Sequence, residues 1–324
     1  MRDGHPGIAA QQIEVGTHRK IEVFYMQICS FLPSATEILY ALGLEDSIAG
    51  VTFECDFPLD AARKTVVVNT NLAHDLTSSE IDRDVSQYSS HGDSLYRVDI
   101  QKLEAIKPDL IVTQELCDVC AISTSYVAKA VHQLSSKPQV LSLTPHTLDD
   151  VLEDILQVGV ATARNAEAHT LVSSLRQRMA KVREMTKLQR PIVVCLEWLS
   201  PPFNGGHWIP QMIDLAGGVD PLGKLGKDSY RMDWDQVLRV DPDVVLVMPC
   251  GHNLERSVAE YRATQFPRGW KQVKAVRNGR VYAVNASAYF SRPGPRLVTG
   301  LEIMHSLLQD DRPQELLGNS WSRL

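Results

Sequence analysis

The chain has 324 residues, of which 44% are hydrophobic, and its formal net charge at pH 7 is -6. This length exceeds that of a typical single domain, and the apolar fraction suffices for two hydrophobic cores. The charges form no long run of one sign, so nothing electrostatic points to nucleic acid or a membrane surface as a partner. A small-molecule ligand is the simpler expectation.

No stretch reaches the roughly 18 apolar residues that a transmembrane helix needs. The first 25 residues also lack the apolar core of a secretory signal. These two observations predict a cytoplasmic protein without a membrane span. Residues 1–25 are polar and aperiodic, and Met26 directly precedes the first clear strand. We therefore interpret them as a disordered tail or an upstream extension.

Strands and helices alternate along the first part of the chain. A strand at residues 27–31 leads into a helix that opens at Pro33, with Ser34 or Thr36 as its cap, and stops at Gly43. Further strands are predicted at residues 48–51, 66–68, 110–112 and 139–143, and further helices at 79–90, 99–107 and 123–134. This alternation is typical of mainly parallel sheets.

One pattern occurs twice, in residues 92–121 and 226–252. Both copies contain Tyr-Arg-x-Asp, a short helix, Pro-Asp and an apolar strand, and the two copies align with each other without a gap. Self-similarity at such a long spacing indicates two related lobes rather than a short-repeat solenoid. The two aspartates of Tyr-Arg-x-Asp, Asp99 and Asp233, are expected to cap the helices that follow them.

Between the lobes, residues 148–187 keep a helical spacing of apolar positions, with Gly159 as the only weak point. A single helix of about 40 residues would be about 60 Å long, which suits a rigid spine. We therefore predict two Rossmann-like α/β lobes at residues 27–146 and 190–324, joined by one long helix within residues 147–189. The second lobe is expected to contain strands at 191–196 and 280–285 and helices at 209–216 and 295–308.

Ligands of parallel α/β sheets bind outside the carboxyl ends of the strands. The loops at those ends are rich in proline and aromatic residues, which give a large flat ligand stacking area at low entropic cost. For Trp208 and Phe57, a place in a lobe core and a place in the cleft are equally expected. For Phe203, Tyr289 and Phe290, which lie among proline and glycine, the cleft is expected. Three glutamates lie at the ends of predicted strands: Glu54, Glu115 and Glu197. Hydrogen bonding to a ligand or to the backbone suits them better than acid/base catalysis.

Several short motifs resemble the substrate-binding proteins that feed cobalamin, haem and ferric siderophores to ABC transporters, and within them the cobalamin-binding branch. They lie at residues 32–43, 50–58, 107–111, 201–203, 217–218 and 289–296. The resemblance covers the chain from about residue 27 and implies a non-enzymatic protein whose two lobes clamp a corrinoid or related tetrapyrrole with little hinge motion. The expected ligand-binding residues are Pro33, Ser34, Glu54, Phe57, Glu115, Trp198, Phe203, His207, Tyr289, Phe290 and Arg292.

Members of this group carry an acidic residue on each lobe for docking on the transporter, and Ser291 stands where the second acid is expected. Docking on an ABC transporter is therefore doubtful. The protein would then bind cobalamin as a cytoplasmic carrier, sensor or salvage protein. The other possibility is that it binds the same ligand as a transporter-type substrate-binding protein.

The rival hypothesis is a metalloprotein, or a metalloenzyme, built from cysteine and histidine. Cys117-x-x-Cys120 of the first lobe, with Cys250 and His252 of the second, offers four soft ligands for Zn²⁺ or an iron–sulfur cluster, and Cys55 and His207 offer two more. The alternative is that these thiols stay reduced and pack against each other or the ligand. Six cysteines without an export signal do not predict a disulfide framework.

Overall fold

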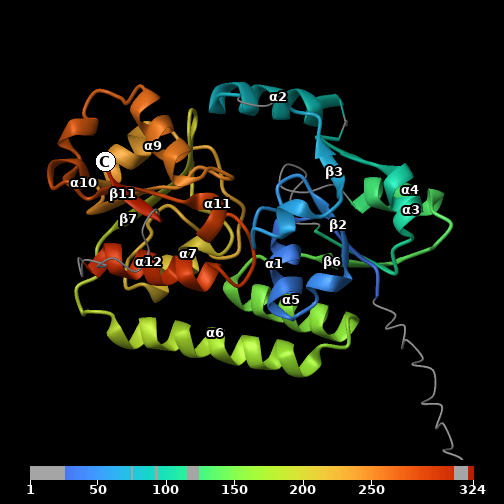
Figure 1. Ribbon diagram of the computed structural model, residues 1–324. Coiled ribbons are helices and arrows are strands. Elements are labelled where there is room, and N and C mark those ends of the chain that lie inside the picture. Colours follow the sequence, from blue (N-terminus) through green and yellow to red (C-terminus); the bar gives the residue numbers. More distant parts are fainter. Residues whose placement is uncertain (1–25, 74–75, 92–93, 115–123, 310–319) are drawn as a thin grey trace, which may run out of the picture.

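The protein consists of two α/β lobes that stand side by side on a pair of helices (Figure 1). The structure, a computed structural model, describes residues 26–73, 76–91, 94–114, 124–309 and 320–324. Each lobe is built on its own sheet, with helices on both faces. The predicted fold class of two lobes with mainly parallel sheets is confirmed.

The first sheet has six strands in the order β4-β3-β2-β1-β5-β6, and all neighbours except β3 and β4 are parallel. Its strands are β1 (Ile28–Ser30), β2 (Ile48–Thr52), β3 (Val66–Thr70), β4 (Tyr96–Val98), β5 (Leu110–Gln114) and β6 (Gln139–Leu143). The helices of this lobe are α1 (Pro33–Ala41), α2 (Ser78–His91), α3 (Ile100–Ile106) and α4 (Thr124–Gln133).

The second sheet has five strands in the order β11-β10-β9-β7-β8, in which the two edge strands are antiparallel to the rest. Its strands are β7 (Val193–Leu199), β8 (Pro202–Asn204), β9 (Val244–Val247), β10 (Val281–Val284) and β11 (Trp321–Arg323). The helices are α7 (Ile209–Leu215), α8 (Trp234–Val240), α9 (Leu254–Ala263), α10 (Lys274–Arg277), α11 (Ala286–Tyr289) and α12 (Leu297–Gln309). The short antiparallel edges β4, β8 and β11 were not predicted, because each has only three residues.

The repeated pattern forms the same contacts in both lobes. Asp99 accepts a hydrogen bond from the Lys102 backbone at the start of α3, and Asp233 forms a capping box at the start of α8. Further along, Asp109 accepts from the Gln27 backbone, just before β1, at 2.8 Å. In the second lobe, Asp243 accepts from the Ile192 backbone, just before β7, at 2.9 Å. The predicted capping role of the two aspartates is confirmed.

The prediction of a single helix across residues 147–189 is wrong. The segment forms two helices, α5 (Leu148–Ala161) and α6 (Asn165–Met185), and the chain reverses at Ala163, whose φ is 56°. Both helices pack their apolar stripes against the first lobe, so the helical spacing continues across the turn and hides it. Helix α6 runs beneath both lobes and contacts α12 of the second (Figure 1), and the start of α5 also packs against the core of the second lobe through Leu148 and Val151.

The lobe limits at residues 27–146 and 190–324 stay a prediction. In the part of the chain that the structure describes, no helix combines the length and apolar character that crossing a bilayer requires.

Candidate functional site

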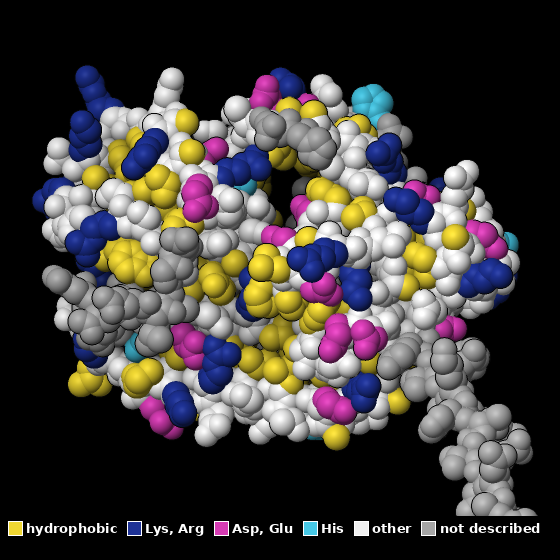
Figure 2. Space-filling model, in the orientation of Figure 1, with side chains coloured by type: hydrophobic (Ala, Val, Ile, Leu, Met, Phe, Trp, Pro, Cys, Tyr) yellow, Lys and Arg dark blue, Asp and Glu magenta, His cyan; other side chains and the backbone are white. Residues whose placement is uncertain are grey.

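The molecular surface is hollowed between the two lobes, beneath α2 (Figure 2). Contacts between the lobes border this cleft on two sides. On one side, Arg231 of the second lobe pairs with Asp82 of α2 at 3.0 Å. On the other, Arg292 donates to the backbone oxygen of Glu54 at 3.0 Å and pairs with Asp56.

An aromatic wall lies at the carboxyl ends of strands in the second lobe. Trp198, near the end of β7, pairs in register with Phe203 on β8, and its ring lies 5.6 Å from the ring of His252. Neither ring nitrogen of His252 nor the indole nitrogen of Trp198 has a hydrogen-bond partner among the described residues. Buried polar atoms are normally paired. These three nitrogens are thus buried and unpaired among the described residues.

Charge at this wall is suppressed by burial. Burial, and to a smaller extent the charge of Arg256, lowers the pKa of His252 to about 4, so its imidazole is neutral at physiological pH. Beside it, burial raises the pKa of Glu197 to about 7, although Glu197 accepts a hydrogen bond from the Gly206 backbone at 3.1 Å. The imidazole of the wall is thus neutral, whereas the guanidinium of Arg231 lies 5.8 Å from the ring centroid of Phe203.

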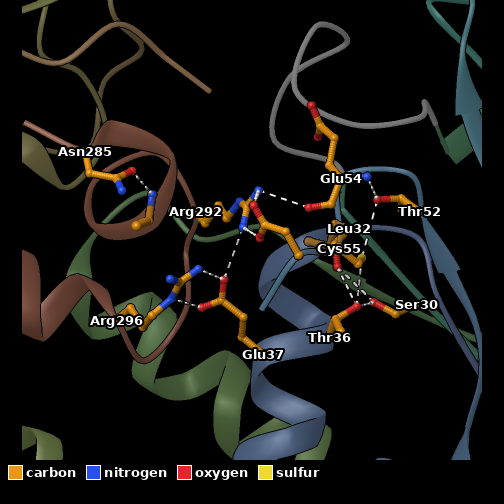
Figure 3. A network of polar contacts seen from close by, with 12 residues as sticks. Ser30, Leu32, Thr36, Glu37, Thr52, Glu54, Cys55, Asn285, Arg292 and Arg296 are labelled. Atoms are coloured by element: carbon orange, nitrogen blue, oxygen red, sulfur yellow. Dashed lines mark hydrogen bonds and ion pairs between the residues drawn. The ribbon is translucent and has the colours of Figure 1, made fainter. Parts of the chain in front are cut away.

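On the first lobe, the loop after β2 carries Cys55 and Glu54 (Figure 3). Cys55 lies 3.1 Å from the Thr36 hydroxyl and 3.4 Å from that of Thr52. Burial raises the pKa of the Cys55 thiol, which keeps it protonated. We conclude that Cys55 is a structural hydrogen-bonding group within this network.

Glu54 points its carboxylate away from Arg292, to which only its backbone is bonded (Figure 3). Solvent reaches this carboxylate, yet the surrounding protein desolvates it enough to raise its pKa, in spite of the opposing charge of Arg292. Among the described residues, the carboxylate of Glu54 thus has no hydrogen-bond partner.

A second group of contacts ties the lobes together below Glu54. Arg296 donates to both carboxylate oxygens of Glu37 on α1, at 2.9 and 2.5 Å, and Arg292 lies 3.6 Å from the same carboxylate. The guanidinium of Arg296 also lies 4.0 Å from the ring centroid of Phe57 and 5.8 Å from that of Tyr289. Burial raises the pKa of Glu37 even though both arginines oppose that shift. We call Glu37, Phe57, Arg292 and Arg296 the interlobe clasp.

The candidate ligand residues thus lie in several separate places. Trp198 and Phe203 belong to the aromatic wall, whereas Phe57 and Arg292 belong to the clasp. Phe290 lies in the core of the second lobe, with 2% of its surface exposed, so we do not assign it to the cleft. Ser34 is likewise buried at the start of α1, beside the half-exposed Pro33. Glu115 lies outside the described residues.

The cysteine metal site has no support from the described residues. Cys117 and Cys120 lie outside them, Cys250 is exposed, and no group of three ligating side chains there includes Cys55, Cys250 or His252. Such a group does occur elsewhere, around His207, with partners that the sequence does not link to it. The clasp residues Glu37 and Arg296 were also missed, because a long-range ion pair leaves no local pattern.

The sequence profile of the periplasmic binding protein family matches residues 28–288. This chain belongs to the periplasmic binding protein family. The family assignment confirms the expected resemblance and the expectation that the chain is a binding protein rather than an enzyme. A vitamin B12-binding protein of Vibrio cholerae serotype O1 is 24% identical over 285 residues, which cover 85% of this chain and 86% of the relative. An uncharacterized ABC transporter substrate-binding lipoprotein of Bacillus subtilis, YvrC, is 24% identical over 302 residues, 89% of this chain and 82% of the relative.

Solved structures of other periplasmic binding proteins share the fold. The periplasmic vitamin B12-binding protein BtuF of Vibrio cholerae superposes with a TM-score of 0.65 at 24% identity, covering 89% of this chain and 98% of that one. The periplasmic heme-binding protein RhuT of Roseiflexus superposes with a TM-score of 0.66 at 17% identity, covering 89% and 99%. At these identities the likeness shows the two-lobed fold and does not choose between ligands.

Three expectations change in the light of these relatives. The predicted cytoplasmic location is wrong, because relatives that match most of the chain are periplasmic binding proteins and substrate-binding lipoproteins. The doubt about transporter docking is withdrawn, since Ser291 alone does not outweigh ABC transporter relatives matched over 89% of the chain. Zinc and iron–sulfur clusters, expected under the rival hypothesis, find no support among these relatives.

Proposed function

We propose that this periplasmic binding protein takes a corrinoid of the cobalamin type into the cleft between its lobes, outside the cytoplasm, and presents it to an ABC transporter. The observation that carries the proposal is the pair of half-buried rings of Trp198 and Phe203 on one lobe, together with the exposed Glu54 on the other. A corrin is a large flat macrocycle with amide side chains, so it needs both stacking surface and hydrogen-bonding groups. Trp198 and Phe203 supply the first, and the carboxylate of Glu54 supplies a hydrogen-bonding group.

The opposite side of the cleft fits the same ligand. The Glu54 carboxylate has no hydrogen-bond partner among the described residues, so it can accept a hydrogen bond from an amide N–H of the ligand or, when protonated, donate one to an amide oxygen. Tyr289 lies between the clasp and the second lobe, half-buried, where its ring can contact a macrocycle. Pro33, Glu115 and Arg292 complete the set of residues for which we propose proximity to the ligand. The vitamin B12-binding relatives, matched over 85% of the chain, support a corrinoid, whereas the structural likeness to a heme-binding protein makes haem the competitor to test.

The test is a calorimetric titration of the full chain with cyanocobalamin, repeated with haemin. We expect Phe203→Ala and Tyr289→Ala to weaken corrinoid binding by about 1–3 kcal/mol each, the scale of a lost buried aromatic contact. Tyr40→Ala is the matched control, because Tyr40 is also half-buried but lies on α1 with its hydroxyl bonded to Asp60. Unchanged corrinoid affinity in both cleft variants would refute the assignment of the wall.

A further inference from the structure

Three ligating side chains from separate loops meet where the start of α5 faces α7. They are His146, which follows β6, His207, which precedes α7, and Asp228; one ligating atom from each lies within 4.8 Å of the others. His207 Nε2 lies 3.3 Å from the Asp228 carboxylate, but it has no hydrogen-bond partner of acceptable geometry among the described residues. His207 Nε2 is therefore a buried nitrogen that lies close to the Asp228 carboxylate but forms no hydrogen bond with it.

The backbone holds His207 in a conformation that side chains rarely adopt. Its φ is 51°, in the left-handed region that favours glycine. Two hydrogen bonds fix it there: the His207 N–H donates to the Lys227 carbonyl at 2.6 Å, and the Gly226 N–H donates to the His207 carbonyl at 3.0 Å. The same pair of bonds places Asp228, the next residue along, beside the imidazole.

Close glycine contacts bring all three loops together. A side chain at Gly206 would meet the backbone nitrogen of Ser229 at 2.2 Å, so only glycine allows the two loops to approach this closely. Gly226 has a φ of 66°, and a Cβ atom added to it would lie 3.6 Å from the Thr147 side chain and 3.9 Å from that of His146. The loop that carries Asp228 is thus packed directly on the segment that carries His146.

His146 is also fixed in place by its neighbours. Its backbone N–H donates to the Asp150 carboxylate at 3.0 Å, next to the capping box that Thr147 forms at the start of α5. The His146 ring stacks on that of His207, with centroids 6.1 Å apart and an angle of 19° between the planes. An ion pair between His207 and Asp228 would not require the imidazole of His146 to lie beside them.

We propose that His146, His207 and Asp228 form a binding site for a divalent first-row transition-metal ion of the Zn²⁺ type. Two imidazoles and one carboxylate are a donor set that such ions accept, with a fourth position left to water or another donor. The 3.3 Å between His207 Nε2 and Asp228 Oδ1 suits two ligands at about 2.0 Å from one tetrahedral ion. His146 and Asp228 are exposed, so an ion can enter from solvent.

The ion would join the end of the first lobe to two loops of the second. His146 directly precedes α5, and the α5 start already contacts α7 through a hydrogen bond from the Leu148 backbone to Gln211 at 2.8 Å. A metal ion here therefore strengthens an existing junction between the lobes. This role is separate from corrinoid binding and does not depend on it.

The experiment measures metal binding to the full, corrinoid-free chain. We expect one Zn²⁺ per chain by equilibrium dialysis, with a rise in Tm on binding. His146→Gln and Asp228→Asn should each reduce the affinity at least about tenfold, since even the loss of an outer-shell partner reaches that scale. His169→Gln is the control, because His169 is exposed on α6, away from the three loops, and its variant should bind Zn²⁺ like the wild type.

Replacing Zn²⁺ by Co²⁺ distinguishes this site from a metal site built on Cys117, Cys120 and Cys250. Co²⁺ held by His146, His207 and Asp228 should show visible d–d bands without thiolate-to-metal charge transfer. Unchanged affinity in both variants, an equal loss in His169→Gln, the absence of binding by the wild type, or a thiolate band would each overturn the proposal. Because the readout uses no corrinoid, its failure leaves the proposed function untouched.

Discussion

Arg231 of the second lobe donates from Nη2 to both carboxylate oxygens of Asp82 on α2, at 3.0 and 3.1 Å. Nearby, Arg256 donates to the backbone oxygen of Leu76, just before α2, at 2.8 Å. A helix that belongs to the first lobe is thereby tied to the second, over the cleft beneath it (Figure 1, Figure 2). The interlobe clasp ties the lobes on the other side of the cleft, so the two lobes are joined above and below it.

The tie at α2 is exposed, and we expect it to matter for local motion rather than for global stability. Arg231→Met should lower the free energy of unfolding by less than about 1 kcal/mol, as is usual for exposed ion pairs. It should increase amide hydrogen exchange in residues 78–91. Arg63→Met, which removes an exposed pair with Asp60 in the first lobe, is the control. Unaltered exchange in α2 would show that Arg231 does not hold this helix.

The clasp pair is buried, so its loss should cost more. Arg296→Met leaves the carboxylate of Glu37, which is 3% exposed, with Arg292 as its remaining partner. We expect the free energy of unfolding to fall by about 2–4 kcal/mol, near the range for a broken buried pair. Denaturant unfolding measures it, with Arg231→Met as the comparison. A cost equal to that of Arg231→Met would contradict the structural role of the clasp.

Substitution of His252 should raise the stability of the protein and weaken its binding of the ligand. Two unpaired ring nitrogens in a site that is 2% exposed destabilise the ligand-free protein. Replacing His252 by Phe should raise the free energy of unfolding by about 1 kcal/mol, because the burial of unsatisfied polar atoms is relieved. The same variant should bind cyanocobalamin more weakly than the wild type. Weaker stability together with full corrinoid affinity would show that His252 only supports the core.

Asp154 predicts the pH dependence of stability. Burial, together with the nearby charges of Asp150 and Glu153, raises the pKa of this α5 carboxyl to about 7. The folded state therefore holds a proton that the unfolded state releases near its ordinary pKa of about 4. Stability contributed by this proton is present below pH 4 and is lost as the pH rises toward 7.

Asp154→Asn removes this titration. Since one pKa unit corresponds to about 1.4 kcal/mol, we expect the variant to gain about 1–3 kcal/mol over the wild type at pH 8. The gain should shrink as the pH falls toward 4. Urea unfolding at several pH values measures it, with the exposed Asp46→Asn as control. A pH-independent difference between Asp154→Asn and wild type would contradict the raised pKa.

Local chemistry explains which parts of the fold were predictable. The repeat was read correctly because its aspartates act within a few residues, as Asp99 does on Lys102. The turn at Ala163 was missed because Gly159, which accepts a hydrogen bond from the Arg164 backbone in this turn, is a single weak point within α5, and an apolar stripe on both sides maintains the helical spacing. Periodicity records which face is buried, and it does not record a reversal of the chain.

The candidate site shows the same limit at longer range. Trp198 and Phe203 were both chosen from the loop expected after one strand, but it is the antiparallel pairing of β7 with the unpredicted β8 that sets them opposite each other. His207 was identified, but its neighbours His146 and Asp228 depend on how three loops pack. Phe290 follows Tyr289 directly and yet turns into the core, where its carbonyl accepts a hydrogen bond from Trp208.

The central claim is that the cleft takes a corrinoid. It is tested most directly by incubating the purified chain with equimolar cyanocobalamin and haemin and recording the ultraviolet-visible spectrum of the protein peak after gel filtration. The account predicts that one cyanocobalamin per chain stays with the protein and that Phe203→Ala retains less of it. A peak that carries haem and no corrinoid would contradict the claim, and the aromatic wall would then belong to a porphyrin site.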